Sequence, residues 1–262
     1  MSTKSEGVCP WRVAWITGAG RGIGAALAKK LCQQGCTVYG SSRTVEELLE
    51  LQHSLAGTPG KFIPAPLDIR RPGQVSSLFE RWESEGVSPD LFVLNAGTHD
   101  PDGAGRFSAQ RCRRLLDVNL QGTINCLDVV LRHCLSRHAG HIAVVSSVAG
   151  YRGLPKAAAY CASKAALISL CESLYVDLQG TGLRLQVINP GFVRTPLTDK
   201  NDFHMPALME PEDAAEAIYR GLGSRRFEIT FPARFVYWLK LLRILPYRLY
   251  LPLMRRVAYR SK

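Results

Sequence analysis

The sequence lacks several features, and each absence excludes a class of protein. None of the eight cysteines forms a C-x-x-C pair, and no cysteine–histidine cluster has zinc spacing, so we expect no metal site. Eight cysteines are too few for a disulfide scaffold in 262 residues, which predicts buried thiols in a reducing, cytoplasmic compartment. Residues 1–11 contain no apolar run, so no secretory signal is expected. Hydrophobic residues make up 46% and charged residues 21%, which excludes a disordered chain and a multi-span membrane protein.

Acidic residues become scarce toward the C-terminal end. The net charge is +11, but residues 224–262 alone contain ten lysines and arginines against one acid, Glu228. The rest of the chain is therefore close to neutral, and the basic character belongs to its last segment.

Short apolar runs alternate with longer helical patterns along residues 10–232, without internal repeats or low-complexity linkers. The candidate strands are 12–16, 37–41, 61–64, 91–95, 141–146, 184–188 and 227–230. The candidate helices are 22–34, 45–54, 74–86, 111–137, 158–180 and 211–221. This alternation predicts one doubly wound α/β domain of the Rossmann type with a seven-stranded parallel sheet. The proline-containing segment 195–211 is predicted to be a substrate lid.

The turn after the first candidate strand is rich in glycine and leads directly into a helix. Its residues are Thr17, Gly18, Ala19, Gly20, Arg21, Gly22, Ile23 and Gly24. Glycines permit a tight turn, a close approach of the backbone to a pyrophosphate, and close packing of helix on sheet. The free N–H groups of the helix N-terminus then favour phosphate. This context predicts a dinucleotide site, whereas glycines alone would indicate only a flexible turn.

The end of the second strand bears on the choice of cofactor. An NAD site needs a carboxylate there for the ribose 2′-hydroxyl, but this chain has Ser41, Ser42 and Arg43. An arginine pairs with a 2′-phosphate, and Arg21 would add a second positive charge on the same side. We therefore expect NADP(H) to be favoured over NAD(H); the alternative is that Arg43 is a solvated loop residue.

Tyr160 and Lys164 lie four residues apart, on one face of a candidate helix, and Ser147 follows the strand thirteen residues upstream. Free tyrosine has a pKa near ~10, and a nearby ammonium lowers the pKa of a phenol. We expect Tyr160 to be the acid/base, Lys164 to lower its pKa, and Ser147 to orient a reacting oxygen. Ser146 competes with Ser147, but the thirteen-residue gap favours Ser147. The chemistry predicted is hydride transfer between a carbonyl and an alcohol.

Taken together, these motifs resemble the short-chain dehydrogenase/reductase family in order and spacing over roughly residues 10–232. They are the Thr-Gly-x-x-x-Gly-x-Gly turn, Asn95-Ala96-Gly97, Asn119, Ser147, Tyr160-x-x-x-Lys164 and Asn189-Pro190-Gly191. The resemblance implies that Asp68 and Ile69 contact adenine and that Asn119 anchors a proton-relay water. It also implies that Asn95, Ala96 and Gly97 support the sheet beside the cofactor. Lys164 would hold the nicotinamide ribose, and Pro190, Gly191, Val193 and Thr195 would line the nicotinamide end.

The end of the chain departs from many members of this family, including the 3-oxoacyl carrier-protein reductases. Those proteins end in a glycine-rich segment, whereas residues 233–262 form a basic, aromatic-rich tail with helical patterns at 233–245 and 247–259. Neither pattern has the ~18 apolar residues that cross a bilayer. Three interpretations stay open: a helix lying at an anionic membrane surface, a lid or dimer element, and weak nonspecific nucleic-acid binding, which is the least favoured.

These observations predict an NADP-dependent oxidoreductase that reduces a lipophilic ketone or aldehyde. The alternatives are a 3-oxoacyl-thioester reductase and a non-catalytic, cofactor-binding scaffold. Family members commonly pair through the two long helices at 111–137 and 158–180, which implies a homodimer or homotetramer.

Overall fold

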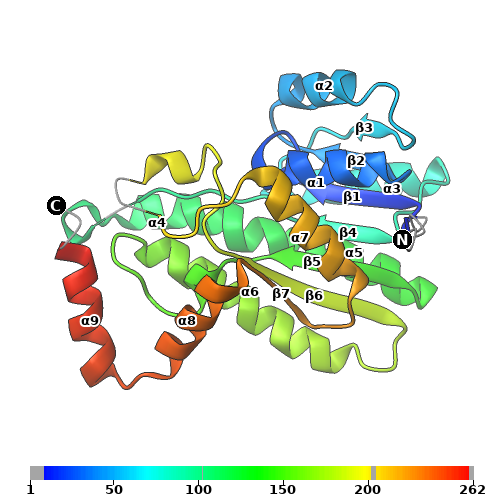
Figure 1. Ribbon diagram of the computed structural model, residues 1–262. Coiled ribbons are helices and arrows are strands. Elements are labelled where there is room, and N and C mark those ends of the chain that lie inside the picture. The colour runs from blue at the N-terminus through cyan, green and yellow to red at the C-terminus, as the bar shows by residue number, and fades with distance from the viewer. Residues whose placement is uncertain (1–8, 102, 202–204, 260–262) are drawn as a thin grey trace, which may run out of the picture.

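Seven short apolar segments pair into one parallel sheet, which forms the centre of this computed structural model (Figure 1). The structure describes residues 9–101, 103–201 and 205–259. The strands are β1 (Val13–Thr17), β2 (Thr37–Ser41), β3 (Phe62–Pro64), β4 (Leu91–Leu94), β5 (Gly140–Val145), β6 (Leu183–Pro190) and β7 (Glu228–Phe231). Their order is β3-β2-β1-β4-β5-β6-β7, so the winding reverses between β1 and β4. The predicted fold class is confirmed.

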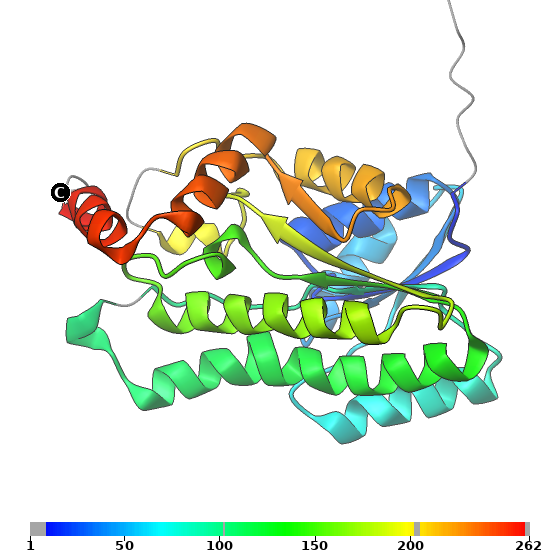
Figure 2. The same ribbon diagram turned by 90° about the horizontal axis from the view of Figure 1, so that it is seen from below.

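Helices cover both faces of the sheet (Figure 2). On one face α1 (Gly22–Gln33) packs against α7 (Pro211–Gly223), and α2 (Val45–Ser54) contacts β3. The opposite face carries α3 (Pro72–Ser84), α4 (Ala109–Leu116), α5 (Gly122–Arg137) and α6 (Ala158–Asp177). Two apolar cores result, one on each side of the strands. Since the strands are buried on both faces, they need the near-continuous apolar sequences that identified them.

The single helix predicted over residues 111–137 proves to be two helices joined by a π-helical turn. α4 ends at Leu116, the turn spans Asp117–Gln121, and α5 begins at Gly122. A π turn adds a residue to the helical path and rotates the side chains that follow it. Asn119 lies in this turn, fully buried, so the irregularity occurs at a residue predicted to be functional.

All eight cysteines are free; seven are buried and Cys112 is half-buried. Burial raises the pKa of the Cys32, Cys126, Cys134 and Cys171 thiols to about 12, so these groups are neutral packing residues.

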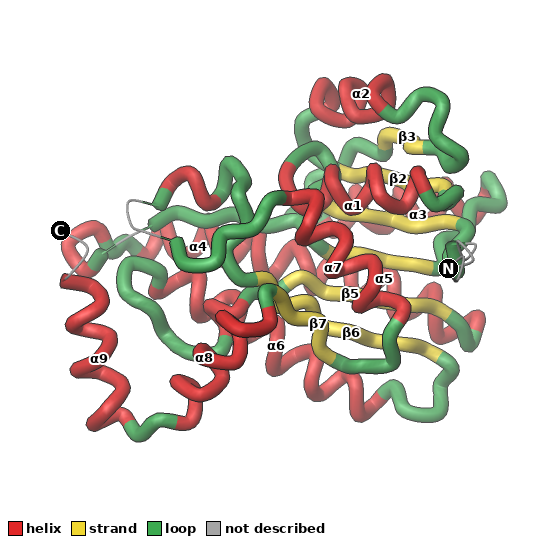
Figure 3. Tube along the Cα trace, in the orientation of Figure 1, coloured by secondary structure: helices red, strands yellow, loops and turns green. Residues whose placement is uncertain are grey.

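The described part of the tail forms two helices that extend from the carboxyl edge of the sheet (Figure 3). α8 (Ala233–Ile244) follows β7 after one residue, and two residues separate α8 from α9 (Tyr247–Tyr259). Within the residues the structure describes, neither these helices nor any other is long and apolar enough to span a bilayer.

The predicted lid is irregular, apart from a 3₁₀ turn at Thr198–Lys200. A β-bridge joins Val193 to Met209 and closes the base of this segment. Residues 202–204, which fall within the predicted lid, lie outside the described residues.

Candidate active site

The glycine turn brings the amino end of α1 close to the carboxyl end of β1. Gly18 and Gly22 have φ angles of +67° and +58°, a region that favours glycine. A Cβ on Gly24 would lie 2.2 Å from the Gly18 carbonyl oxygen, so only glycine permits this contact between helix and turn. Arg21 is the N-cap residue of α1 and makes no side-chain cap. The first N–H groups of α1 are therefore available to an anion.

The Asn-Ala-Gly motif after β4 braces this turn through hydrogen bonds. The Asn95 side chain donates to the carbonyl oxygens of Thr17 and Gly18, both at 3.0 Å. In return the Thr17 hydroxyl accepts from the backbone N–H groups of Asn95 and Ala96, at 3.0 and 3.1 Å. Thr17 and Asn95 thus hold two neighbouring strand ends in register beneath the cleft.

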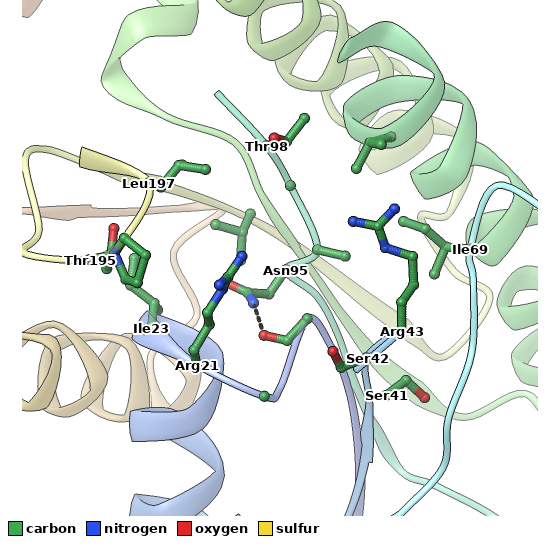
Figure 4. A pocket seen from close by; sticks show the side chains of 18 of the residues that line it. Arg21, Ile23, Ser41, Ser42, Arg43, Ile69, Asn95, Thr98, Thr195 and Leu197 are labelled. Carbon is green, nitrogen blue, oxygen red and sulfur yellow. Dashed lines mark hydrogen bonds between the residues drawn. The ribbon is translucent and has the colours of Figure 1, made fainter. Parts of the chain in front are cut away.

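Two of the arginines that line the cleft are Arg21, at the amino end of α1, and Arg43, just after β2 (Figure 4). Arg43 carries the charge predicted to meet a 2′-phosphate. Arg21 lies 3.5 Å from the carboxylate of Glu47, which also lines the cleft, so its charge is partly countered. The prediction that Arg21 adds a second full positive charge here did not anticipate Glu47, because the two residues meet only in the fold.

Asp68 and Ile69 line the same end of the cleft. The Arg70 side chain donates hydrogen bonds to the Asp68 carboxylate, at 2.9 Å from Nε to Oδ1. This interaction, helped by the charge of Arg43, lowers the pKa of Asp68. Asp68 is therefore ionised at neutral pH.

Ser147, Tyr160 and Lys164 meet at the other end of the cleft, where β5 ends and α6 begins. The Ser147 hydroxyl lies near enough to the Tyr160 phenol to act against the rise in the phenol's pKa. Lys164 lies one turn after Tyr160, with Nζ 5.8 Å from the centre of the tyrosine ring and donating to the Val145 carbonyl at 2.9 Å. Ser146 instead donates to the Lys164 carbonyl at 2.8 Å, which leaves Ser147 as the serine that contacts the tyrosine.

The pKa of the tyrosine differs from the sequence-based expectation. Burial raises the pKa of Tyr160 to about 12, and the Ser147 hydroxyl offsets this only in part. Burial also lowers the pKa of Lys164 to about 8. Burial disfavours both charged forms and dominates both shifts, so the lowering of the Tyr160 pKa by Lys164 stays a prediction. Tyr160 is a neutral phenol at pH 7, which suits a proton donor.

Asn119 does not line the cleft but lies behind it. Its side chain accepts from the Thr98 N–H at 2.7 Å and donates to the Thr98 carbonyl at 2.9 Å and to Ser163 Oγ at 3.2 Å. Ser163 in turn donates to the Tyr160 carbonyl at 2.7 Å. Asn119 therefore connects the segment after β4 to the helix that carries the tyrosine.

The segment after β6 closes the cleft beside the catalytic end. Pro190, Gly191, Val193 and Thr195 all line it, followed by Pro196, Leu197 and Thr198. A Cβ on Gly191 would meet Pro232 and Phe235 at 3.1 and 3.2 Å, so the start of α8 packs directly against this wall.

Every predicted site residue lines the cleft except Thr17, Gly24 and Asn119, which support it from behind. Sequence reasoning missed Glu47 and His99. The His99 ring lies 4.6 Å from the Tyr160 ring and is buried. Its position next to Asn95-Ala96-Gly97 in sequence was the available signal.

The arrangement fits a nicotinamide dinucleotide. Uncapped N–H groups and positive-φ glycines lie at the middle of the cleft, an arginine and an ionised aspartate at one end, and a phenol, a hydroxyl and a buried lysine at the other. The cleft also lies where the strand order reverses, which is the usual ligand position in open parallel sheets.

Comparisons with known proteins agree with this geometry. A sequence model of short chain dehydrogenases matches residues 12–205. An uncharacterized oxidoreductase from Myxococcus xanthus is 36% identical over 247 residues, covering 94% of this chain and 98% of its own length. A 3-oxoacyl-[acyl-carrier-protein] reductase from Thermotoga maritima is 32% identical, covering 72% of this chain and 77% of its own.

Among solved structures, a short chain dehydrogenase/reductase from Burkholderia phymatum in complex with NAD has a TM-score of 0.81 and 25% identity, covering 90% of this chain and 94% of its own. A short-chain dehydrogenase from Sphingobium yanoikuyae in complex with NADPH shares the fold, with a TM-score of 0.78 and 23% identity, covering 88% of this chain and 92% of its own. With the cleft built from the family's motifs and the family model covering most of the chain, the protein belongs to the short-chain dehydrogenase/reductase family and is an oxidoreductase.

Proposed function

We propose that the protein is an NADPH-dependent reductase of a lipophilic ketone or aldehyde. The observation that carries this proposal is that Ser147, Tyr160 and the buried Lys164, one helical turn after the tyrosine, lie together at the wall of the dinucleotide cleft. A neutral phenol beside a hydroxyl suits proton donation to a carbonyl oxygen better than proton removal from an alcohol, so reduction is the favoured direction.

Each of the three side chains has one task in this reaction. NADPH, when bound, would supply the hydride for this reduction. Tyr160 gives its phenolic proton to the carbonyl oxygen, and Ser147 donates a hydrogen bond that orients the same oxygen. Lys164, when charged, stabilises the negative charge that Tyr160 acquires. Asn119 holds the Thr98 backbone and, through Ser163, the start of α6, so it is a positioning residue.

The preference for NADPH rests on Arg43. A 2′-phosphate has two negative charges to place, and of the three arginines that line the cleft Arg43 is the one with no ion pair among the described residues. Glu47 pairs with Arg21 and would repel a phosphate unless Arg21 remained between them. NADPH selection is therefore assigned mainly to Arg43, with Arg21 acting as a shield against Glu47.

A lipophilic substrate is favoured by the apolar side chains of Val193, Pro196 and Leu197 on the wall beside Thr195. The similarity to the Thermotoga maritima enzyme keeps a 3-oxoacyl-thioester reductase as the second candidate. A non-catalytic scaffold would not need Ser147, Tyr160 and Lys164 together at the cleft, so it is the least favoured.

Two further properties belong to this proposal. Exposed apolar residues on α5 and α6, including Leu135 (40%) and Val176 (68%), support pairing through these helices in a homodimer or homotetramer. The eight free thiols support a reducing, cytoplasmic location.

The test is NADPH oxidation with long-chain ketones, aldehydes and an acetoacetyl thioester, using Tyr160→Phe and, as matched control, Tyr175→Phe. Tyr175 is on the same helix, far from the cleft, and 38% exposed. We expect Tyr160→Phe to lose about 10²–10⁴-fold in kcat while NADPH binding is retained, and the control to behave as wild type. Equal turnover by both variants would contradict the mechanism. Reduction of the thioester alone would establish the second candidate.

A further inference from the structure

The α8 helix has an outward face of exposed apolar side chains, and α9 exposes further apolar side chains that are spread around its circumference. Of fifteen large apolar or aromatic residues exposed in the described part of the chain, eight lie between residues 237 and 253. Tyr237, Trp238, Leu241 and Ile244 are on α8, and Tyr247, Leu249, Leu251 and Leu253 are on α9. The α8 residues follow helical spacing, so they share one side of that helix. Exposed apolar residues gathered in this way indicate a surface that contacts something else.

This face has a fixed orientation because the inward side is anchored to the enzyme. Arg152 Nη1 donates to the carbonyl oxygens of Leu242, Arg243 and Leu245 at 2.8, 3.0 and 2.6 Å, where α8 ends. The Arg152 guanidinium also lies 4.0 Å from the ring centre of Tyr250, which is buried and donates to the Gly153 carbonyl at 2.5 Å.

A second anchor joins the middle of α8 to the sheet. The Glu228 carboxylate on β7 accepts hydrogen bonds from Lys240, from Tyr151 and from Asn189. Val236, one turn earlier, is 2% exposed. Rotation of α8 about its axis would break these inward contacts. The outward face therefore stays exposed to solvent.

The charges around the outward face are all positive. Residues 229–262 contain no aspartate or glutamate. Arg234, Arg243, Arg248, Arg255 and Arg256 are exposed. Glu228 is the carboxylate nearest to the tail in sequence, and it forms an ion pair with Lys240.

We propose that this face docks on an anionic lipid bilayer. Basic residues interleaved with Trp, Tyr and Leu on an anchored helix suit the headgroup region, where the rings enter the interface and the arginines meet lipid phosphates. Each arginine near an anionic surface strengthens binding about fivefold, equivalent to about 1 kcal/mol. A second copy of the chain fits less well, since a twofold interface would set these arginines against one another.

Docking places the bilayer beside the cleft. α8 begins at the carboxyl edge of the sheet (Figure 1), and residues at the same edge line the cleft. Phe235 at its start lies 5.7 Å from the ring of Phe192, next to the Pro190-Gly191 wall of the cleft. The substrate class follows: a long-chain carbonyl compound that partitions into the bilayer and reaches Tyr160 without crossing water. This second step rests on the proposed reductase activity, whereas docking itself does not.

The full-length protein contains its own reporter for docking. Trp238 is 68% exposed, whereas Trp11, Trp15 and Trp82 are buried. With phosphatidylcholine vesicles containing phosphatidylglycerol, we expect the protein to sediment with the vesicles and Trp238 emission to shift to shorter wavelength. Pure phosphatidylcholine and high salt should weaken both effects, because the arginines lose their partners. Absence of co-sedimentation would overturn docking, and so would a blue-shifted, self-associated protein without vesicles.

Two matched variants decide whether the outward face is responsible. Ile244→Asp changes a side chain that is 76% exposed on α8, and Leu49→Asp makes the same kind of change on α2, at 43% exposure and distant from the tail. Ile244→Asp should weaken vesicle binding at least about tenfold, and Leu49→Asp should bind as wild type. Equal binding by both would overturn the assignment.

The substrate step is tested separately with a long-chain ketone held in the same vesicles and a short, water-soluble ketone. Ile244→Asp should lower kcat/KM only for the ketone in vesicles. Equal losses for both ketones, or none, would overturn delivery from the bilayer. If neither ketone is reduced by the wild type while co-sedimentation persists, the proposed reductase function fails and docking stands.

Discussion

The cleft and the tail are built in opposite ways. In the cleft, polar groups are buried and hydrogen-bonded: Thr17, Asn95 and Asn119 each join two segments, and glycines bring backbones into contact. In the tail, large apolar side chains are exposed between arginines, and only a few residues such as Val236 and Tyr250 are buried. Hydrogen bonds and close backbone contacts fix the cleft residues in place, whereas the side chains on the outward face of the tail make few contacts.

This difference separates a site that the chain forms by its own contacts from a surface that needs an external partner. Buried, satisfied polar groups define a site that the chain completes by itself, apart from its ligand. An exposed apolar face is buried only when another molecule or a surface covers it. Substitutions should therefore damage the cleft strongly and the tail face weakly, unless a surface is present for the tail to bind.

The largest effect is expected at Gly18, compared with Gly86. The two have almost the same φ, +67° and +68°, but a Cβ on Gly18 would lie 2.8 Å from Ala96 Cα, whereas Gly86 has open space. Gly86→Ala should cost only the backbone strain, about 1–2 kcal/mol of unfolding free energy. Gly18→Ala should cost more and lower NADPH affinity at least about a hundredfold, because the turn must move. Chemical denaturation and calorimetry measure both; equal behaviour would contradict the close packing.

Acid should destabilise the enzyme body through His141. Burial lowers the pKa of His141 to about 4, and its ring accepts from Trp11 Nε1 at 3.1 Å. Since the unfolded state binds this proton first, stability should fall by about 3 kcal/mol as the pH drops from 6.5 to 4. The described tail, residues 233–259, contains no acid and no histidine. Denaturant unfolding across this pH range in wild type and His141→Gln measures the contribution, and the variant should show a shallower fall. Identical pH dependence would exclude His141 as its source.

Loss of the Arg152 contacts with α8 and Tyr250 should destabilise the tail helices and leave the sheet unaffected. Arg152→Met removes the three hydrogen bonds to the end of α8 and the guanidinium contact with Tyr250, worth about 2 kcal/mol together. Hydrogen exchange in α8 and α9 should become about thirtyfold faster, while exchange in β1 and β4 should stay unchanged. Arg132→Met, an exposed arginine on α5, is the control and should leave the tail protected. Unchanged exchange in α9 would show that other contacts hold it.

The smallest effect is a pH dependence of catalysis. Since burial lowers the pKa of Lys164 to about 8, its ammonium is lost above that pH. The kcat/KM of carbonyl reduction should then fall, approaching tenfold per pH unit. NADPH binding measured at the same pH values separates this effect from loss of cofactor. A flat profile to pH 10 would mean that the Lys164 charge does not contribute.

Local patterns predicted most of the cleft, because the glycine turn and the Tyr160–Lys164 spacing lie within single stretches of chain. Contacts between distant segments were not predictable in this way. Glu47 forms an ion pair with Arg21, and the His99 ring packs on Tyr160. Arg152 donates a hydrogen bond to the end of α8, ninety residues later in the chain. The direction of the Tyr160 pKa was missed for the same reason, since burial is a property of the fold.

The central claim is that the cleft holds NADPH through Arg43 for carbonyl reduction. Its most direct test is calorimetric titration of NADPH and NADH into wild type and Arg43→Ala. We predict that wild type prefers NADPH and that the variant loses about 10–100-fold in NADPH affinity, with NADH affinity unchanged. Equal affinities in wild type, or an NADPH preference that survives in Arg43→Ala, would contradict the account.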